Sequence, residues 1–333
     1  EFDKGHITPL APAPEATKKD IEDSVRIVAQ MGEEPFVEAL KGGADVIIAG
    51  RSYDPSVFAC LPIKEGFDRA LALHMGKILE CAAICALPGS GSDCMFGYLR
   101  KDHFVLEPLS KDRKCTTLSV AGHTLYEKTD PYHLPGPGGA LDLHGCHFEQ
   151  IDDNKVKISG TVFEPTDGYF LKLEGTRLVG YRTISVAATT DPIMISKIDS
   201  IIESVKARVK DNFDNYGIKD YYLDFKIYGK NGVMSMFDGI DGNMGSELMV
   251  VIEAVAKTQK EADTICSFAR STMLHFGYEG RIATAGNLAF PFSPSDCHMG
   301  EVYEFSLYHL LKAEDPKQYF PVEYVEYADG QRK

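Results

Sequence analysis

An early part of the chain combines a helix-like segment, a pair of glycines and a short apolar run. Apolar residues recur at helical spacing over residues 20–40, with a break expected near Gly32. The glycine pair at 42–43 follows, and glycine is the residue that helix C-termini favour. The next run, ADVIIAG at residues 44–50, resembles a strand of a buried parallel sheet. This order predicts an α/β fold with a parallel or mixed sheet core.

The later chain indicates a β-rich middle section and a second, smaller layer. Short β-like runs follow one another over residues 141–184. After Asp191 and Pro192, helical and strand patterns alternate, which predicts a second, smaller α+β domain. We therefore expect an extended arm or linker at residues 1–19, an α/β core with the site at 20–190, the α+β domain at 191–300, and a tail or helix at 301–333.

Composition and charge narrow the classes of partner. The 333 residues carry a formal net charge of −14 and no basic stripe, so we expect neither nucleic acid nor anionic membrane as a partner. Eight cysteines in a chain of this length do not suggest a disulfide framework, which favours a reducing compartment such as the cytoplasm. No apolar run reaches about 18 residues and no signal peptide is visible, which predicts a soluble protein.

Two charged residues follow the predicted strand, where open α/β sheets bind their ligands. Arg51 could clamp a carboxylate or phosphate with both arms of its guanidinium, and Asp54 could hold it in place. The alternative is an N-cap Asp54 paired with a structural arginine.

A predicted helix that follows places His74, Lys77 and Cys81 on one face, while Glu80 is expected to point elsewhere. Lys77 is a candidate anion-binding residue at a cleft, with His74 beside it. The alternative is a half-buried helix with a hydrogen-bonded core histidine. The spacing is not that of a metal site.

The segment from Cys115 to Leu143 is dense in reactive residues. Ser119, His123 and Glu127 lie at i, i+4 and i+8 of a helix predicted over residues 116–128. Glu127 could fix the tautomer of His123, which makes His123 a candidate general acid/base. Cys115, near the helix start, is a possible thiolate nucleophile. The alternative is an ordinary capped helix with a surface Glu–His pair.

Three further groups offer weaker indications. The turn formed by Gly136, Pro137, Gly138 and Gly139 could present N–H groups to an oxyanion, or it could be purely structural. It lacks the lysine and the spacing of the known nucleotide motifs, so no cofactor is assigned. Arg182, inside a β-like run, needs a carboxylate or a ligand as partner. His144 and Cys146 share a strand face but His147 does not, so no metal is assigned.

Several stretches in order resemble one family, the acyclic terpene utilisation (AtuA-like) proteins. The stretches are GGADVIIAGRSYDPSVFACLPI, ALHMGKILECAAICALPGS, KCTTLSVAGHTLYEK, GPGGALDL, KLEGTRLVGYRTI and LHFGYEGRIATAGNLAFPFSP. The resemblance implies a role in the breakdown of citronellol-type terpenes, in the setting of acyl-CoA or small-carboxylate catabolism. Members usually carry a glycine-rich Rossmann-like segment before the region where this sequence starts, and many have a small ferredoxin-like partner domain. The resemblance therefore implies either that another chain supplies part of the site or that this sequence is a processed product.

Together these features predict an intracellular catabolic enzyme, or enzyme subunit, for a small-molecule carboxylate or CoA thioester. The expected chemistry is that of a lyase or hydratase, with His123 and Glu127 as the acid/base pair. Arg51, Lys77 and Arg182 would bind the carboxylate or phosphate of the substrate. The alternatives are acyl or thioester transfer, or hydrolysis, by Cys115, and a non-catalytic scaffold subunit. A homo-oligomer or a complex with a second subunit is expected.

Overall fold

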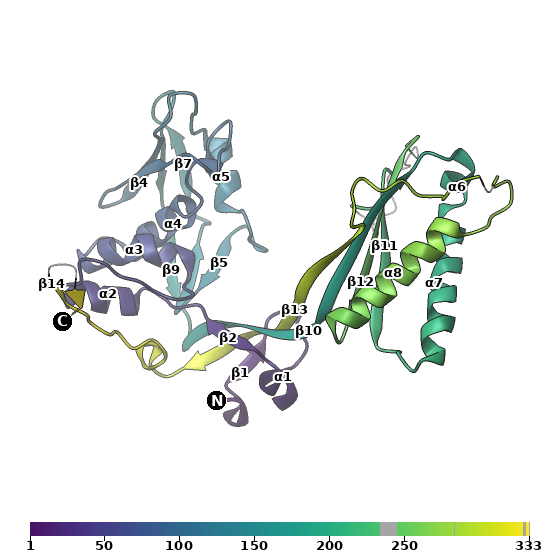
Figure 1. Cartoon of the computed structure of the whole chain (residues 1–333). Helices are drawn as coiled ribbons and strands as arrows, with labels where there is room; N and C mark the ends of the chain where they lie inside the picture. The colour runs from purple at the N-terminus through teal and green to yellow at the C-terminus, as the bar shows by residue number, and fades with distance from the viewer. Residues whose placement is uncertain (234–244, 283, 329–330, 333) are drawn as a thin grey trace. The chain divides into compact units, whose positions relative to one another are not determined.

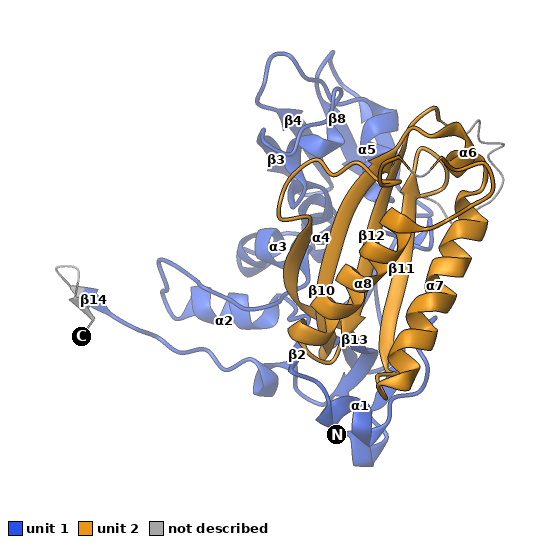
Figure 2. Ribbon diagram, turned by 45° about the vertical axis from the view of Figure 1, so that its right-hand side comes forward, with its two compact units in different colours: residues 1–175, 306–333 blue, residues 176–305 orange. Residues whose placement is uncertain are grey.

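The structure is a computed structural model that describes residues 1–233, 245–282, 284–328 and 331–332. The chain divides into two compact units, residues 1–175 with 306–333, and residues 176–305 (Figures 1 and 2). The long strands β10 (Tyr169–Thr189) and β13 (Asp296–Ala313) each contribute residues to both units. Residues 301–313 are thus part of a strand, where the sequence led us to expect a tail or helix.

The second unit is an antiparallel sheet with two helices packed on it. β12 (Leu248–Ala256) pairs antiparallel with β10 and with β11 (Tyr221–Tyr228). The helices α7 (Ile198–Asn215) and α8 (Gln259–His275) lie along this sheet, and α6 (Pro192–Ser196) precedes them (Figure 2). Alternate residues of β12 and one face of each long helix form a single buried apolar core. The helix and strand patterns after Asp191 are therefore present.

The first unit contains two small antiparallel sheets and a short helix bundle (Figure 1). The sheets are β3-β4-β8-β7 and β5-β6-β9. Their strands are β3 (Met95–Leu99), β4 (His103–Pro108), β5 (His133–Gly136), β6 (Gly139–Asp142), β7 (His147–Gln150), β8 (Val156–Ser159) and β9 (Val162–Pro165). The helices are α1 (Lys18–Glu22), α2 (Glu34–Lys41), α3 (Asp54–Lys64), α4 (Arg69–Leu79) and α5 (Thr117–Thr124).

Helix α4 is the centre of this unit. Its residues from Ala70 to Ile78 are all buried, because α3, α5 and strands of both small sheets pack around it. A helix that is covered on every side must satisfy its polar side chains internally, and this requirement shapes the site described below.

Short elements complete the fold. They are the strands β1 (Ile7–Pro9), β2 (Arg26–Ala29), β14 (Tyr327–Ala328) and β15 (Gln331–Arg332), and the 3-10 helices η1 (Phe2–Lys4), η2 (Ala82–Cys85) and η3 (Pro316–Tyr319). β1 pairs antiparallel with β13, so the expected N-terminal arm contains a strand. No helix of the described residues has both the length and the apolar character to cross a membrane.

The fold is mixed α/β, but the parallel sheet core predicted from residues 44–50 is wrong. All strand pairs with a known register are antiparallel. Residues 44–50 form no strand, and Val46 and Ile48 are 79% and 94% exposed. Near this segment, the described residues contain one parallel bridge, which is isolated and pairs Met31 with Ser52. An apolar run becomes a strand only when a neighbouring strand supplies its hydrogen bonds, and here none does.

Candidate functional site

Two tyrosine rings of the first unit organise the predicted site residues. The first is Tyr53, which precedes helix α3. A Cβ atom added to Gly136 would lie 2.9 Å from the Tyr53 ring, so the glycine-rich turn packs directly on it. Lys128 Nζ lies 5.5 Å from the centre of the same ring. Tyr53 thus joins the start of α3, the turn and the segment after α5.

The second ring is Tyr126, in the turn that follows α5. It stacks on the His123 imidazole, with ring centres 5.3 Å apart and an angle of 14° between the planes. Lys77 Nζ, from α4, lies 5.6 Å from the centre of the Tyr126 ring. Lys77 is almost fully buried and donates a hydrogen bond to Glu80 Oε1 at 2.8 Å. The expectation that Glu80 points elsewhere is therefore wrong: it is the counter-ion of Lys77.

His123 is a buried imidazole with an unused nitrogen. The residue is 6% exposed, and its Nε2 has no hydrogen-bond partner among the residues that the structure describes. Burial lowers the pKa of His123, and the nearby charge of Lys77 lowers it further, while Glu80 and Glu127 oppose this. A neutral imidazole is therefore favoured at neutral pH.

The predicted pairing of Glu127 with His123 is not present. Helix α5 ends at Thr124 instead of reaching residue 128, so the two residues do not share a helix face. Glu127 has a φ of 63°, in the left-handed region, and its side chain is exposed. No hydrogen bond connects it with His123 in the described structure. Glu127 acts on His123 only through its charge.

Lys128 is the site residue that the sequence did not reveal. Burial lowers its pKa to about 8, and the charge of Lys77 contributes to the shift. Among the described residues we find no carboxylate within ion-pair distance of its Nζ. The position carries no motif, since a lysine after a helix is usually a surface residue. Lys128 is assigned to the candidate site only because its Nζ lies over the Tyr53 ring.

Arg51 and Asp54 form an ion-pair network instead of an open clamp. Arg51 Nη1 lies 2.9 Å from Asp54 Oδ1, and Arg51 Nε lies 3.0 Å from Glu174 Oε2. Lys172 Nζ is 3.1 Å from the other oxygen of Glu174. The carboxylates already occupy the guanidinium, which agrees with the alternative of a structural arginine. Asp54 is the first residue of α3, and Tyr53 takes the N-cap position.

His74 has the structural role that was its alternative. It is fully buried, its Nε2 lies 3.1 Å from Thr124 Oγ1, and its Nδ1 lies 2.7 Å from Thr161 Oγ1. Because the Thr124 hydroxyl donates to the Val120 carbonyl, it accepts the hydrogen bond from His74 Nε2–H. Burial lowers the pKa of His74 to about 3. Both ring nitrogens of His74 already have partners, whereas His123 Nε2 has none in the described residues, so the proposed site omits His74.

Cys115 is a core residue. It is completely buried among the side chains of Leu71, Phe104 and Val120. A hydrogen bond from the Cys85 thiol lowers the pKa of Cys115, and the same bond raises that of Cys85. A nucleophile needs access to its substrate as well as a low pKa, and the packing denies that access.

The glycine turn is a tight β-hairpin. Gly136 and Gly139 are opposite each other at the ends of β5 and β6, with Pro137 and Gly138 between them. Gly138 has a φ of 74°, and proline followed by such a glycine is the pattern of a type II turn. A Cβ atom on Gly138 would approach the Tyr169 ring to 3.0 Å. The turn therefore needs its glycines for packing, and its role toward an oxyanion stays a prediction.

Arg182 belongs to the second unit, so the structure does not place it with the other predicted residues. It lies on β10, and its Nε is 2.5 Å from Glu253 Oε1 on the neighbouring strand β12. Lys226 also contacts Glu253. Arg182 thus has the carboxylate partner that a strand arginine was expected to need.

The comparisons with known proteins are in accord with the resemblance noted above. A family model described as acyclic terpene utilisation family protein AtuA matches residues 5–89 and 103–289. These ranges contain Tyr53, Lys77, His123 and Lys128. No curated protein and no solved structure matches the chain significantly.

Proposed function

Because the chain belongs to the acyclic terpene utilisation family, we propose that it acts as an enzyme, or enzyme subunit, in the breakdown of acyclic terpenes. The substrate class is a terpenoid carboxylate or its CoA thioester. The reaction is of the lyase or hydratase type, in which a proton moves at a carbon beside a carbonyl group. The site is the group of residues around Tyr53 and Tyr126.

The unused Nε2 of His123 is the observation that carries this proposal. A buried polar atom without a partner costs free energy, about 1–3 kcal/mol, unless a ligand or water satisfies it. A neutral imidazole has a lone pair that accepts a proton, so His123 is suited to act as the general base. In the direction of dehydration it would take the proton from the α-carbon and pass it to the hydroxyl group on the β-carbon, which leaves as water while the Cα–Cβ double bond forms. Hydration is the reverse of this step.

Two lysines are candidates to supply the positive charge that an anionic substrate needs. Lys77 is neutralised by Glu80, whereas Lys128 has no carboxylate at ion-pair distance in the described residues. Lys128 is therefore the better candidate to bind the substrate carboxylate or the developing enolate oxygen. The net charge of −14 makes such a local cation important, because the rest of the molecule repels anions.

The test is turnover of citronellyl-CoA and of citronellate by the purified protein and by two histidine variants. We expect His123→Gln to lower kcat by about 100-fold or more, since general base catalysis typically contributes that much. His147→Gln, at an exposed position of β7, is the matched control and leaves kcat unchanged. Equal kcat values for His123→Gln and the unaltered protein would refute the assignment.

A second candidate function is that of a subunit in a larger assembly, and one observation favours it. Val46 and Ile48 are strongly exposed in the first unit, as are Val25, Ile27 and Val28. Exposed apolar residues in such number commonly mark an interface. Native mass spectrometry of protein purified from its source distinguishes a homo-oligomer from a complex with a second subunit. A stable monomer would contradict both assemblies.

A further inference from the structure

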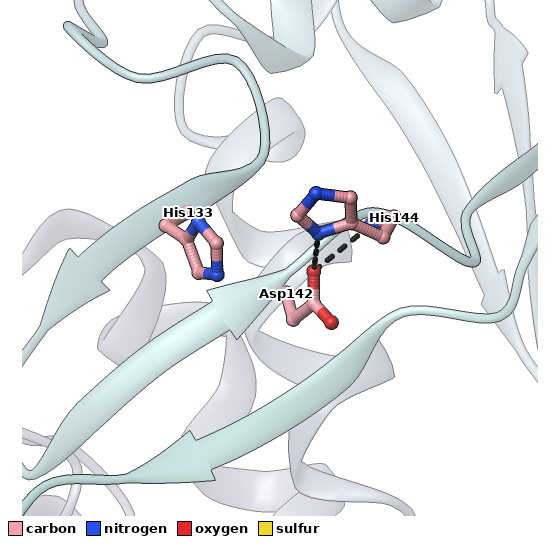
Figure 3. A group of neighbouring side chains, drawn as sticks. All are labelled: His133, Asp142 and His144. Atoms are coloured by element: carbon pink, nitrogen blue, oxygen red, sulfur yellow. Dashed lines mark hydrogen bonds and ion pairs between the residues drawn. The ribbon is translucent and has the colours of Figure 1, made fainter.

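A second cluster of chemically active side chains lies at the far end of the β5–β6 hairpin from the glycine turn. His133 and Asp142 are opposite each other in the register of the two strands. His144 follows Asp142 by two residues, and its Nδ1 lies 2.6 Å from Asp142 Oδ1. One ligand atom from each residue lies within 4.8 Å of those of the other two (Figure 3).

The geometry of the backbone pre-forms this cluster. The His144 N–H donates a hydrogen bond to Asp142 Oδ1 at 2.9 Å, which turns the chain so that the His144 ring returns toward the hairpin. The Tyr132 ring stacks on His144, with centres 4.4 Å apart and 14° between the planes. These contacts hold one imidazole and the carboxylate in place before any ligand arrives.

Two imidazoles and one carboxylate form a ligand set that suits a borderline divalent metal such as Zn²⁺. Ca²⁺ and Mg²⁺ prefer oxygen ligands alone. At bond lengths of about 2.0–2.2 Å, ligand atoms around a tetrahedral ion lie roughly 3.4 Å apart. The separations in the cluster are at most 4.8 Å, so the longer ones need to shrink by at most about 1.4 Å. The hydrogen bond between His144 Nδ1 and Asp142 Oδ1, at 2.6 Å, gives way if both atoms bind the ion. His133 and His144 are about half exposed, with 47% and 57% of their side chains accessible, so rotation about their side-chain bonds can close the gap.

Two more carboxylates border the cluster. Glu164 Oε2 lies 3.9 Å from His133 Nε2, and Asp130 Oδ1 lies 3.9 Å from His133 Nδ1. Either can complete the coordination or accept a hydrogen bond from the ring nitrogen that does not bind the metal. Their negative charges also favour a cation at this position.

We propose that His133, Asp142 and His144 form a binding site for a divalent transition metal of the zinc class. From the sequence we considered only His144 with Cys146 and His147 and assigned no metal, because the partners of His144 in this cluster come from the hairpin that precedes it. The site uses none of the residues assigned to the proposed function, so the two proposals stand or fall separately.

The test is titration of the metal-free, full-length protein with Zn²⁺ by calorimetry and with Co²⁺ by absorption spectroscopy. We expect one equivalent to bind at these residues, with Co²⁺ bands of low coordination number and no sulfur charge-transfer band. That last feature separates this site from binding by the free cysteines. Asp142→Asn, which keeps the acceptor for the His144 N–H, and His144→Ala each weaken binding at least about tenfold.

The matched control is His147→Ala, an exposed histidine outside the cluster, which leaves the affinity unchanged. Circular dichroism of each variant establishes that its fold is retained. Absence of stoichiometric binding in the unaltered protein, or unchanged binding in the Asp142→Asn and His144→Ala variants, overturns the proposal.

Discussion

At the scale of single residues, the burial of helix α4 explains where expectation and structure differ for His74 and Lys77. The spacing of His74 and Lys77 correctly places them on this helix. It could not show that both side chains are buried, that Thr124 and Thr161 bind the histidine, or that Glu80 neutralises the lysine. Thr124 and Thr161 come from distant segments, so a single sequence does not reveal them, whereas Glu80 lies three residues after Lys77 and was expected to point away from it.

Lys128 offers a direct test of the electrostatics of the site. Its pKa of about 8 means that the amine titrates well below the ordinary value of 10.5. In a ¹³C NMR titration of protein with labelled lysine Cε atoms, we expect one resonance with a midpoint near pH 8. That resonance is absent in Lys128→Met. If the resonance that is lost in Lys128→Met titrates near pH 10.5 in the unaltered protein, Lys128 is not in the buried environment described above.

The lowered pKa of Lys128 makes the free energy of unfolding depend on pH. Between about pH 8 and 10.5 the unfolded chain holds a proton on Lys128 that the folded protein lacks. The free energy of unfolding contributed by this residue therefore rises with pH over that window. Lys128→Met removes this rise and is expected to stabilise the protein at pH 7, where burial of the charged amine is unfavourable.

At the scale of elements, the sequence predicted those that have strong local patterns. The helical and strand patterns that alternate after Asp191 correspond to α7, β11 and α8. Strand β2 was missed, because Val25, Ile27 and Val28 were counted as part of a helix. The length of α5 was overestimated for a similar reason: the backbone leaves the helical conformation after Thr124, and no proline or glycine marks the end.

The hairpin turn gives a test at this scale. Gly138→Ala puts a Cβ atom on a residue with a φ of 74° and 3.0 Å from the Tyr169 ring. We expect a loss of about 1–2 kcal/mol in the free energy of unfolding, measured by urea denaturation. The control is Gly122→Ala, in helix α5, where an added Cβ meets no atom within 4 Å. Alanine there is expected to be neutral or stabilising, and an equal loss in both variants would contradict this account of the turn.

At the scale of the whole molecule, the division into two units defines what can fold alone. The second unit is one continuous segment, residues 176–305, and it has its own apolar core. The first unit is made of two separate segments, residues 1–175 and 306–333. Strand β13 leads the chain from the second unit into the second of these segments. The change of sequence pattern near Asp191 follows the end of β10, whereas the division into units falls inside that strand, and sequence patterns could not show that β10 and β13 each belong to both units.

We expect the isolated segment 176–305 to fold as a cooperative unit. Circular dichroism should show helix and strand content, with a single unfolding transition in urea. Residues 1–175 alone, which lack the strand residues 306–313, serve as the comparison and are expected to unfold at a lower urea concentration. A non-cooperative transition for residues 176–305 would show that its core depends on the first unit.

The central claim is that Tyr53, His123 and Lys128 surround one substrate. A crystal structure of the protein with bound citronellyl-CoA, or a non-reactive analogue, tests it most directly. The account predicts that the α-carbon and thioester carbonyl lie within about 3–3.5 Å of His123 Nε2 and Lys128 Nζ respectively. A thioester bound elsewhere, with His123 Nε2 still without a partner, would contradict it.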